Sequence, residues 1–263
     1  MQALPAFFRP TESRSAQRVQ QWMLAVGRGA AFLYDVARSA RDGATWLPLT
    51  LIQMRRLGVQ SLPIGLFIAV FTGIVLALLS SYSFSGAVPL YFVGTLVGKT
   101  IMMELAPVLT GLALAGRVGA NIAAEVGTMR VTEQVDALET LAYDPLAYLV
   151  VPRVLAATLM FPVVVALAMA TGVVSGWITA GSLLHLSTNE FVKGLRLFYE
   201  FKDIWFGLVK SMSFGFAIAL IGCFKGLRTM GGAEGVGRST TEAVVLGASL
   251  ILVLDAFWAV VLL

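Results

Sequence analysis

Two long stretches of the sequence contain no charged residue, and they constrain the fold more than any other feature. They run from Leu57 to Gly98 and from Val154 to Asn189. A helix of about 20 apolar residues crosses the hydrocarbon core of a bilayer, so the first stretch is too long for one crossing. It is interrupted at Ser80–Ser81 and at Pro89, which favours two crossings joined by a short exposed turn. The sequence therefore predicts an all-α, polytopic membrane protein.

The composition supports a membrane rather than an aqueous environment. Hydrophobic residues make up 58% of the chain and charged residues 13%, whereas a soluble domain carries about 25% charged residues. The net charge of +4 does not indicate nucleic-acid binding, because the basic residues flank the apolar segments, where the positive-inside rule accounts for them. Cys223 is the only cysteine, which excludes an internal disulfide and a cysteine metal cluster.

Five spans are predicted from the apolar segments. Arg and Lys are concentrated before the first span and in the loops 117–153 and 225–238, and they are sparse before the fourth span. This asymmetry predicts a cytoplasmic N-terminus. The predicted transmembrane domain covers residues 55–263 and follows an N-terminal segment of residues 1–54. The predicted spans are residues 57–80, 89–116, 154–184, 204–224 and 242–263.

The N-terminal segment has the pattern of an amphipathic helix. Apolar residues such as Trp22 and Leu33 recur at helical spacing, and polar residues such as Gln21 and Asp35 occupy the opposite face. A helix of this kind with basic flanks lies along the cytoplasmic leaflet. Packing of its apolar face on the rest of the protein is an alternative, and the two interpretations are compatible.

Four ionisable residues fall within the predicted spans, namely Lys99, Glu104, Lys210 and Asp255. An ionised side chain at the bilayer centre costs roughly 2.5–3.5 kcal/mol on insertion scales, so each one requires an explanation. From the rise of a helix, Lys210 lies about 9 Å below the exoplasmic face and Asp255 about 12 Å below it. These similar depths predict a Lys210–Asp255 contact, which is either a purely structural ion pair or part of a substrate path.

Glu104 lies near the middle of the second span and is followed by Pro107. The proline frees a backbone carbonyl and bends the helix. A carboxylate at this depth beside a bend is a candidate functional residue. The alternative is an interhelical hydrogen bond from the protonated acid. Lys99 lies more than one turn earlier and on another face of the helix.

Two motif-like strings are not assigned a catalytic role. GTLVGKT (residues 94–100) has too few residues between its glycines for a phosphate-binding loop, and GVVSG (residues 172–176) is not a nucleophile elbow. Both strings have GxxxG spacing, as do Gly222 and Gly226, which indicates helix packing. His185 is the only histidine, so neither a metal site nor a catalytic histidine is assigned.

The loop between the second and third spans contains a predicted short amphipathic helix with an acidic surface. Thr132 is its predicted N-cap and Pro145 its predicted end. Alone, this pattern indicates either a docking element or an ordinary capped loop. The candidate docking residues are Thr132, Glu133, Gln134, Val135, Asp136, Leu138, Glu139 and Tyr143.

Three strings together resemble the signature of MlaE-type permeases. They are ELAPVLTGLALAGRVGANIAAEVGTMRVTEQ (residues 104–134), its continuation ALETLAYDP (137–145) and GGAEGVGRSTTEAVV (231–245). The resemblance extends over roughly residues 50–263. One position departs from the pattern, because many members carry Arg directly before the Glu, where this chain has Met103. Lys99 is the candidate replacement for that arginine.

The resemblance implies a homodimeric permease in an ABC transporter of the bacterial inner membrane. Its implied partners are a second copy of the chain, a cytoplasmic ATPase (MlaF-like) and an exoplasmic MCE protein (MlaD-like). The substrate would be phospholipid, moved between the inner membrane and the outer envelope. ATP would be bound and hydrolysed by the ATPase, so the chain itself is expected to have no cofactor and not to be an enzyme.

The resemblance also implies roles for particular residues. The charged positions of the family map onto Glu104, Lys210 and Asp255, and the loop helix would be the coupling helix that docks in a groove of the ATPase. Candidate walls of the lipid cavity, near the exoplasmic ends of the first two spans, are Leu78, Leu79, Tyr82 and Tyr91.

Two other classes of function are weighed against this hypothesis. A secondary transporter driven by protons through Glu104 would require inverted repeats or discontinuous helices in two matched halves, and the sequence shows neither. Its uptake would follow the proton gradient and persist without ATP. An intramembrane hydrolase would require a nucleophile with an adjacent base, and the sequence offers no such pair.

Overall fold

The computed structural model describes residues 14–41, 43–84 and 89–262, and every element in those residues is helical. Five helical stretches are long and apolar enough to cross a membrane, which confirms the predicted number of spans. Residues 1–13 of the predicted N-terminal segment and the last residue of the fifth predicted span lie outside the described residues. The five stretches are Thr45–Ser83, Phe92–Val131, Leu146–Leu183, Phe201–Leu227 and Gly232–Val261.

Each helical stretch is longer than the span predicted for it. Several of the predicted ends, such as the one before Arg117, were set at charged residues. The hydrogen-bonded backbone of a helix continues through such residues when their side chains reach polar surroundings. The second stretch accordingly continues past Arg117 to Val131. The first is built from α2 (Gly43–Gln53), η2 (Met54–Gly58), η3 (Val59–Ser61) and α3 (Leu62–Ser83). The second contains α4 (Phe92–Thr100), η4 (Ile101–Leu105), α5 (Ala106–Leu114), η5 (Ala115–Gly119) and α6 (Ala120–Val131). The last three contain η6 (Leu146–Val150) with α8 (Val151–Leu183), then α10 (Phe201–Leu227) and α11 (Gly232–Leu262).

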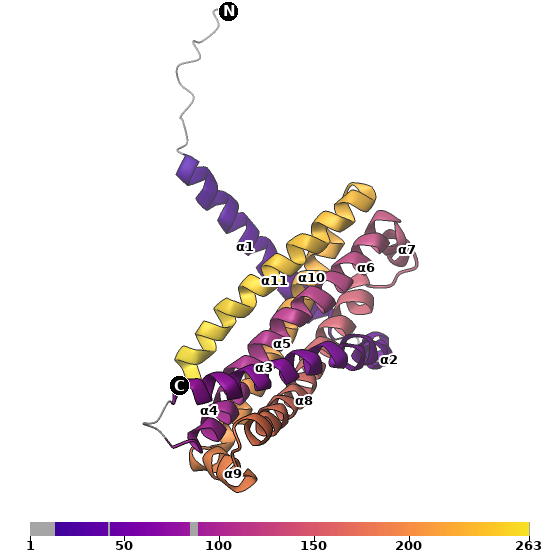
Figure 1. The fold of residues 1–263 in the computed structure, drawn as a ribbon. Coiled ribbons are helices and arrows are strands. Elements are labelled where there is room, and N and C mark those ends of the chain that lie inside the picture. The colour runs from indigo at the N-terminus through magenta and orange to yellow at the C-terminus, as the bar shows by residue number, and fades with distance from the viewer. Residues whose placement is uncertain (1–13, 42, 85–88, 263) are drawn as a thin grey trace, which may run out of the picture.

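The N-terminal helix α1 (Arg14–Ser39) projects from the bundle at a steep angle (Figure 1). Its C-terminal part packs on the protein, because Val36 is buried and the Phe32 ring lies 5.3 Å from the Phe224 ring. Met23, nearer the start of the helix, and Leu33, which lies between Phe32 and Val36, are exposed. The side chain of Trp22 lies outside the described residues. Both interpretations of this helix therefore remain predictions for its exposed part.

The first span begins inside the segment that the sequence assigned to the N-terminal region. That segment was predicted to end at residue 54, whereas α2 joins the first helical stretch from Thr45 onward. Pro48 lies inside α2.

The core of the bundle forms around α8, which packs against α3 on one side and α10 on another. Small residues allow these helices to touch, since a Cβ at Gly73 of α3 would overlap the carbonyl oxygen of Gly172 in α8. The three predicted GxxxG pairs all face another helix. The pair 94/98 faces α9 (Thr188–Leu197), the pair 172/176 faces the first two spans, and the pair 222/226 faces α6.

Two spans contribute little to this core and leave most of their surface open. Only 22% of the first span's most apolar window is buried and 11% of the fifth's, compared with 50% for the third and the fourth. Large apolar side chains project from the open faces of α3 and α11, among them Phe67, Phe71, Leu252 and Phe257. In a single copy these faces must contact lipid or another protein.

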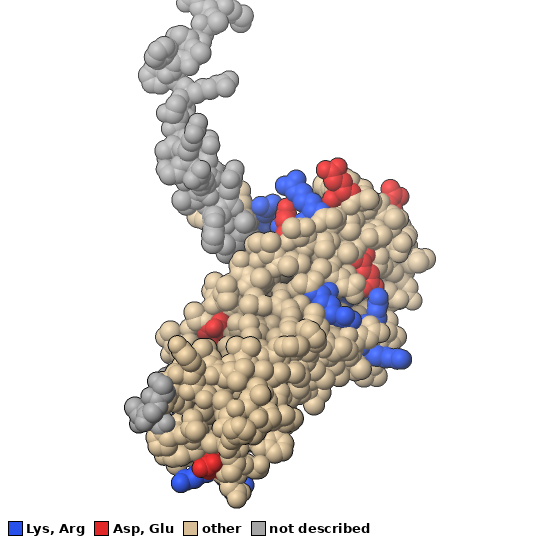
Figure 2. Space-filling view, viewed as in Figure 1, with Lys and Arg blue, Asp and Glu red and all other residues tan. Residues whose placement is uncertain are grey.

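The two ends of the bundle are polar and the belt between them is nearly uncharged. Helices α2, α6 and α7 (Gln134–Thr140) lie at one end, and α4, α9 and the C-terminal end of α11 lie toward the other (Figure 1). In the space-filling view most of the Lys, Arg, Asp and Glu side chains gather toward the end that carries α6 and α7, and a smaller group marks the opposite tip (Figure 2). This distribution is typical of a protein whose apolar belt lies in a bilayer.

Candidate functional site

Three of the four ionisable residues predicted inside the membrane meet at the side chain of Lys210, which is fully buried in α10. Its Nζ lies 2.8 Å from Glu104 Oε2 and 2.5 Å from Asp255 Oδ1. The contact with Asp255, predicted from the matching depths, is therefore present. It is an ion pair by distance, because Asp255 Oδ1 accepts no hydrogen bond of normal geometry from the described residues. The contact with Glu104 was not predicted.

A π-helical turn positions Glu104 for this contact. The turn is η4, and Pro107 follows it at the beginning of α5. A proline lacks the N–H that would bond the carbonyl four residues earlier, and here that carbonyl belongs to Met103. Lys210 Nζ donates to the Met103 carbonyl oxygen at 3.4 Å. The freed carbonyl expected from the sequence is therefore the third partner of the ammonium group.

Close packing brings α10 to this turn. A Cβ at Gly207 would overlap the Met102 carbonyl oxygen, so glycine at this position allows the two backbones to approach. The ring of Phe206 lies 4.6 Å from Lys210 Nζ and covers part of the ammonium group. On the other side, Trp258 Nε1 donates to Ser213 Oγ at 2.9 Å and joins α11 to α10 near Asp255.

The resulting group, here called the triad, consists of Glu104, Lys210 and Asp255. It contains two carboxylates and one ammonium, so it carries a formal charge of −1 when all three are ionised. The side chains of Glu104 and Asp255 are 39% and 24% exposed, whereas that of Lys210 is 0% exposed. The partly exposed carboxylates can therefore accept a proton or a further cationic group while Lys210 holds them in place.

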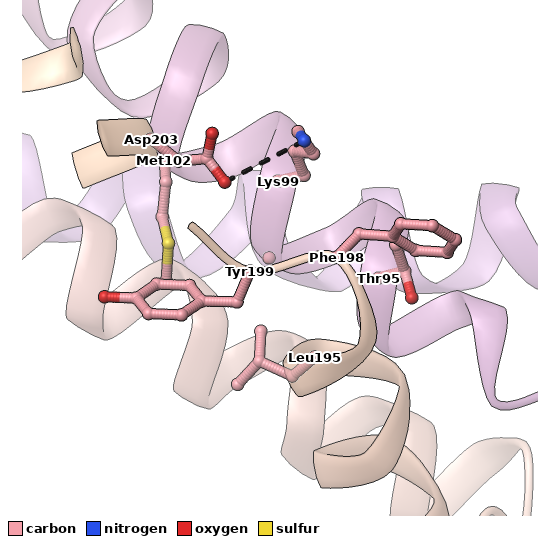
Figure 3. Close-up of a pocket in the computed structure, with 8 residues that line it drawn as sticks. Thr95, Lys99, Met102, Leu195, Phe198, Tyr199 and Asp203 are labelled. Carbon is pink, nitrogen blue, oxygen red and sulfur yellow. Dashed lines mark ion pairs between the residues drawn. The ribbon is translucent and has the colours of Figure 1, made fainter. Parts of the chain in front are cut away.

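Lys99, the candidate replacement for the missing arginine beside Glu104, has a different partner. Its Nζ lies 3.9 Å from Asp203 Oδ2 (Figure 3), and the Asp203 side chain is only 3% exposed. Sequence analysis missed Asp203 because the fourth span was predicted to begin one residue later. Asp203 is also the N3 residue of a capping box with Glu200 at the start of α10, and the spacing of these two acids is the signal that could have identified it. The small pocket that Lys99 and Asp203 line has a volume of about 10 Å³, which is too small for a lipid.

The four candidate residues of the lipid cavity do not form one group. Leu78, Leu79 and Tyr82 project from the end of α3 and are exposed, Tyr82 to 84%. Tyr91 instead stacks on Phe92 and lies beneath Lys193 of α9, whose Nζ is 5.1 Å from the Tyr91 ring. Their role in a cavity remains a prediction.

A short helix, α7, is present in the loop where the coupling helix was predicted, but its start differs from the prediction. Thr132 is not its N-cap, because the Thr132 hydroxyl donates to the Thr128 carbonyl and closes α6 instead. The N-cap is Glu133, which has a left-handed backbone with φ 60°. This conformation reverses the chain between α6 and α7, and the short-range N-cap pattern in the sequence did not reveal it.

The end of α7 also differs from the prediction. Pro145 begins the next helical segment, η6, whereas α7 already ends at Thr140. The Tyr143 N–H donates to the Leu138 carbonyl and the Ala142 N–H to the Glu139 carbonyl, which is the hydrogen-bond pattern of a Schellman motif. Ala142 takes the left-handed position of this motif, with φ 60°.

The surface of α7 offers acidic and apolar groups to solvent. Val135 is buried and anchors the helix, and Asp136 pairs with Arg130. The described side chains that remain exposed include Glu133, Gln134, Glu139 and, beyond the helix end, Leu141 and Tyr143. The motif that sequence analysis identified therefore forms a protruding surface.

Comparison with known proteins places this arrangement among permeases. The family model described as "Permease MlaE" matches residues 50–261. A probable ABC transporter permease protein of Rickettsia typhi is 42% identical over 87% of this chain and 88% of its own length. A second, from Synechocystis, is 43% identical over 79% of both chains. The intermembrane phospholipid transport system permease protein MlaE of Haemophilus influenzae is 33% identical over 92% of this chain and 94% of its own.

Proposed function

Because the chain belongs to the MlaE permease family, we propose that it is the permease of an ABC transporter that moves phospholipids between the inner membrane and the outer envelope. The observation that carries this proposal is the triad. A buried ammonium group holds two partly exposed carboxylates inside the apolar belt. Ionisable groups inside a membrane-spanning bundle are costly to bury and often mark substrate pathways, which supports a role for the triad in lipid passage.

A second copy of the chain is the proposed partner within the membrane. The open apolar faces of α3 and α11 support it, because the first and fifth spans have the lowest buried shares of the five. Glu104 and Asp255 are reachable by solvent or ligand in a single copy. A lipid held between two copies would meet these carboxylates from the open side.

A cytoplasmic ATPase, MlaF-like, is the proposed source of energy, so this chain binds no ATP and needs no cofactor of its own. The protruding α7 surface supports docking of such a partner. Glu133 and Glu139 are exposed there, next to the apolar side chains of Leu141 and Tyr143. Docking would place α7 on the cytoplasmic side and with it the N-terminus.

The opposite end of the bundle is the proposed contact for an exoplasmic MCE protein, MlaD-like. Three exposed aromatic residues support this assignment, namely Phe198, Tyr199 and Phe201 between α9 and α10. Aromatic side chains are enriched at protein interfaces. The proposed location is the inner membrane, with the ATPase on its cytoplasmic side and the MCE protein on its exoplasmic side.

Charge reversal on α7 tests the docking proposal. Glu133→Lys combined with Glu139→Lys changes two exposed carboxylates and leaves the Arg130–Asp136 pair in place. Co-purification of the ATPase subunit with this double variant should fall sharply, while the chain itself remains folded and inserted. The matched control is Asp35→Lys on α1, an exposed acid outside the α7 surface, which should retain the ATPase. Full recruitment by the double variant would contradict the assignment of α7.

A further inference from the structure

A cleft of about 250 Å³ opens between the start of the first span and the second span. Its lining residues come from the turns η2 and η5 and their neighbours; η2 directly follows α2 and η5 directly precedes α6 along the chain. Helices α2 and α6 lie toward one end of the bundle (Figure 1). Two guanidinium groups, of Arg56 and Arg117, line it together with the polar side chains of Gln60, Ser61 and Asn121. No carboxylate is among the described residues that line it. The lining therefore carries two positive charges, and its amide and hydroxyl groups can both donate and accept hydrogen bonds.

Irregular helical turns form both walls of the cleft. Arg56 belongs to the π-helical turn η2, and Arg117 to the π-helical turn η5. Widened turns of this kind occur frequently at functional sites. Leu57 and Val118, the neighbours of the two arginines, are 3% and 2% exposed and belong to the core. The backbone that carries the two arginines is therefore held by the hydrophobic core.

The charges around the cleft do not balance. Glu125 Oε1 lies 3.1 Å from Arg56 and 2.9 Å from the buried guanidinium of Arg153. One carboxylate thus serves two arginines and holds Arg56 in position. Arg117 makes no ion pair with any described residue, and its side chain is exposed. Taken together, these four groups carry a formal excess of two positive charges at the cleft.

The buried hydroxyl of Ser61 is a second observation that supports ligand binding in the cleft. Its side chain is 0% exposed, and its hydroxyl has no hydrogen-bond partner among the described residues. Many helical hydroxyls of this chain donate to the carbonyl four residues earlier, as those of Thr72 and Ser80 do. The buried Thr110 hydroxyl also lacks a partner among the described residues, but Thr110 does not line the cleft. An unsatisfied buried hydroxyl costs about 1–3 kcal/mol. A ligand with acceptor oxygens would satisfy it.

We propose that this cleft binds a phosphate group. A phosphodiester offers only acceptor oxygens at neutral pH and pairs with guanidinium groups through two parallel hydrogen bonds. The arginine-rich end of a span lies near the level where lipid headgroups present phosphodiesters. Free inorganic phosphate presents the same kind of acceptor oxygens, with one or two O–H groups in addition, and is the other source of this ligand group. The residues that line the cleft are not those of the triad. Phosphate binding in the cleft therefore does not depend on whether the chain transports lipid.

The full-length chain in a maltoside detergent, which contains no phosphate, allows the test. Dihexanoyl phosphatidylglycerol and inorganic phosphate are titrated separately by calorimetry. Arg117→Gln should weaken binding about tenfold or more, as expected for the loss of a charge-assisted bidentate contact. Ser61→Ala keeps every charge and should weaken it several-fold. The matched control is Arg55→Gln, which removes the same charge one residue outside the cleft and should change affinity less than about twofold.

A phospholipid carrying a diazirine in its headgroup locates the bound molecule. Crosslinks mapped to residues 54–61 and 115–121, and lost in Arg117→Gln, would assign the site to a lipid phosphate. Saturable binding of inorganic phosphate without lipid binding would assign it to the free anion. The proposal is overturned if neither compound binds, or if Arg55→Gln weakens binding as much as Arg117→Gln. Equal melting temperatures of the variants exclude unfolding as the cause, and Ser61→Ala provides the test if Arg117→Gln is unstable.

Discussion

Replacement of Lys210 by methionine should destabilise the chain more than replacement of either of its carboxylate partners. Lys210 is the common partner of Glu104 and Asp255, and it also donates to the carbonyl that Pro107 leaves free. Methionine approximately fills the same volume but offers no donor. The variant therefore leaves two carboxylates and one carbonyl without their shared cation.

The magnitude follows from the burial of the three side chains. Breaking a buried ion pair by removing one partner costs roughly 3–5 kcal/mol, and Lys210 is completely buried. Glu104→Gln and Asp255→Asn each leave Lys210 with one carboxylate, and we expect each to cost about 1–3 kcal/mol. Asp255→Asn should be the milder of the two, because Asp255 Oδ1 accepts no well-formed hydrogen bond from the described residues.

A charge-balanced variant separates lost charge from lost packing. In Lys210→Met with Glu104→Gln and Asp255→Asn, no uncompensated charge remains, so stability should recover relative to Lys210→Met alone. Transport should be abolished in the triple variant as in Lys210→Met, because the triple variant lacks both the ammonium group and the two carboxylates. Unfolding of all four variants in the same detergent, followed by tryptophan fluorescence, measures the order. The reasoning is refuted if Lys210→Met is as stable as the original chain, or if the triple variant is the least stable of the set.

Three further predictions concern the ends of helices and one close contact. Ala142→Gly should protect α7 from amide exchange and stabilise it by roughly 0.5–1 kcal/mol, because the left-handed φ at this position suits glycine; unchanged exchange would contradict the Schellman assignment. Gly194→Ala should lower the free energy of unfolding by about 1–3 kcal/mol and loosen α9, because the new Cβ would overlap the Tyr91 carbonyl oxygen. Gly237→Ala, with open space around the position, should be neutral or stabilising in thermal unfolding. Hydrogen bonds from Ser187 lower the pKa of Glu190. The stabilisation of the α9 start is therefore fully present above the ordinary glutamate pKa and is lost as pH falls through the lowered value. Amide exchange at the first turn of α9 should rise in acid, and Ser187→Ala should move the midpoint of this rise to higher pH.

The sequence was sufficient to predict the features that depend on distance along the chain. The lengths of the apolar segments predicted five spans. The similar depths of Lys210 and Asp255 below the exoplasmic face predicted that these two residues pair. Glycine spacing predicted three helix contacts. In each case the physical constraint is one-dimensional, because a helix converts residue number into height.

Features that depend on how helices rotate against one another were not predictable. Glu104 reaches Lys210 because a π-helical turn before Pro107 changes the direction in which it points, and a regular helix gave no sign of this. Lys99 was the candidate replacement for the arginine that many family members carry before Glu104, and the packing of α10 brings Asp203 to it. The cleft at Arg56 and Arg117 joins two spans through irregular turns, and its unpartnered Ser61 hydroxyl is recognisable only in three dimensions.

Reconstituted lipid movement tests the central claim most directly. The chain is placed in vesicles that contain fluorescent phospholipid, alone or with its ATPase and exoplasmic partners, and transfer to acceptor protein is followed with and without ATP. The account predicts transfer that requires both ATP and the ATPase and that is lost in Lys210→Met. Transfer by the chain alone, driven by a proton gradient and indifferent to ATP, would contradict it.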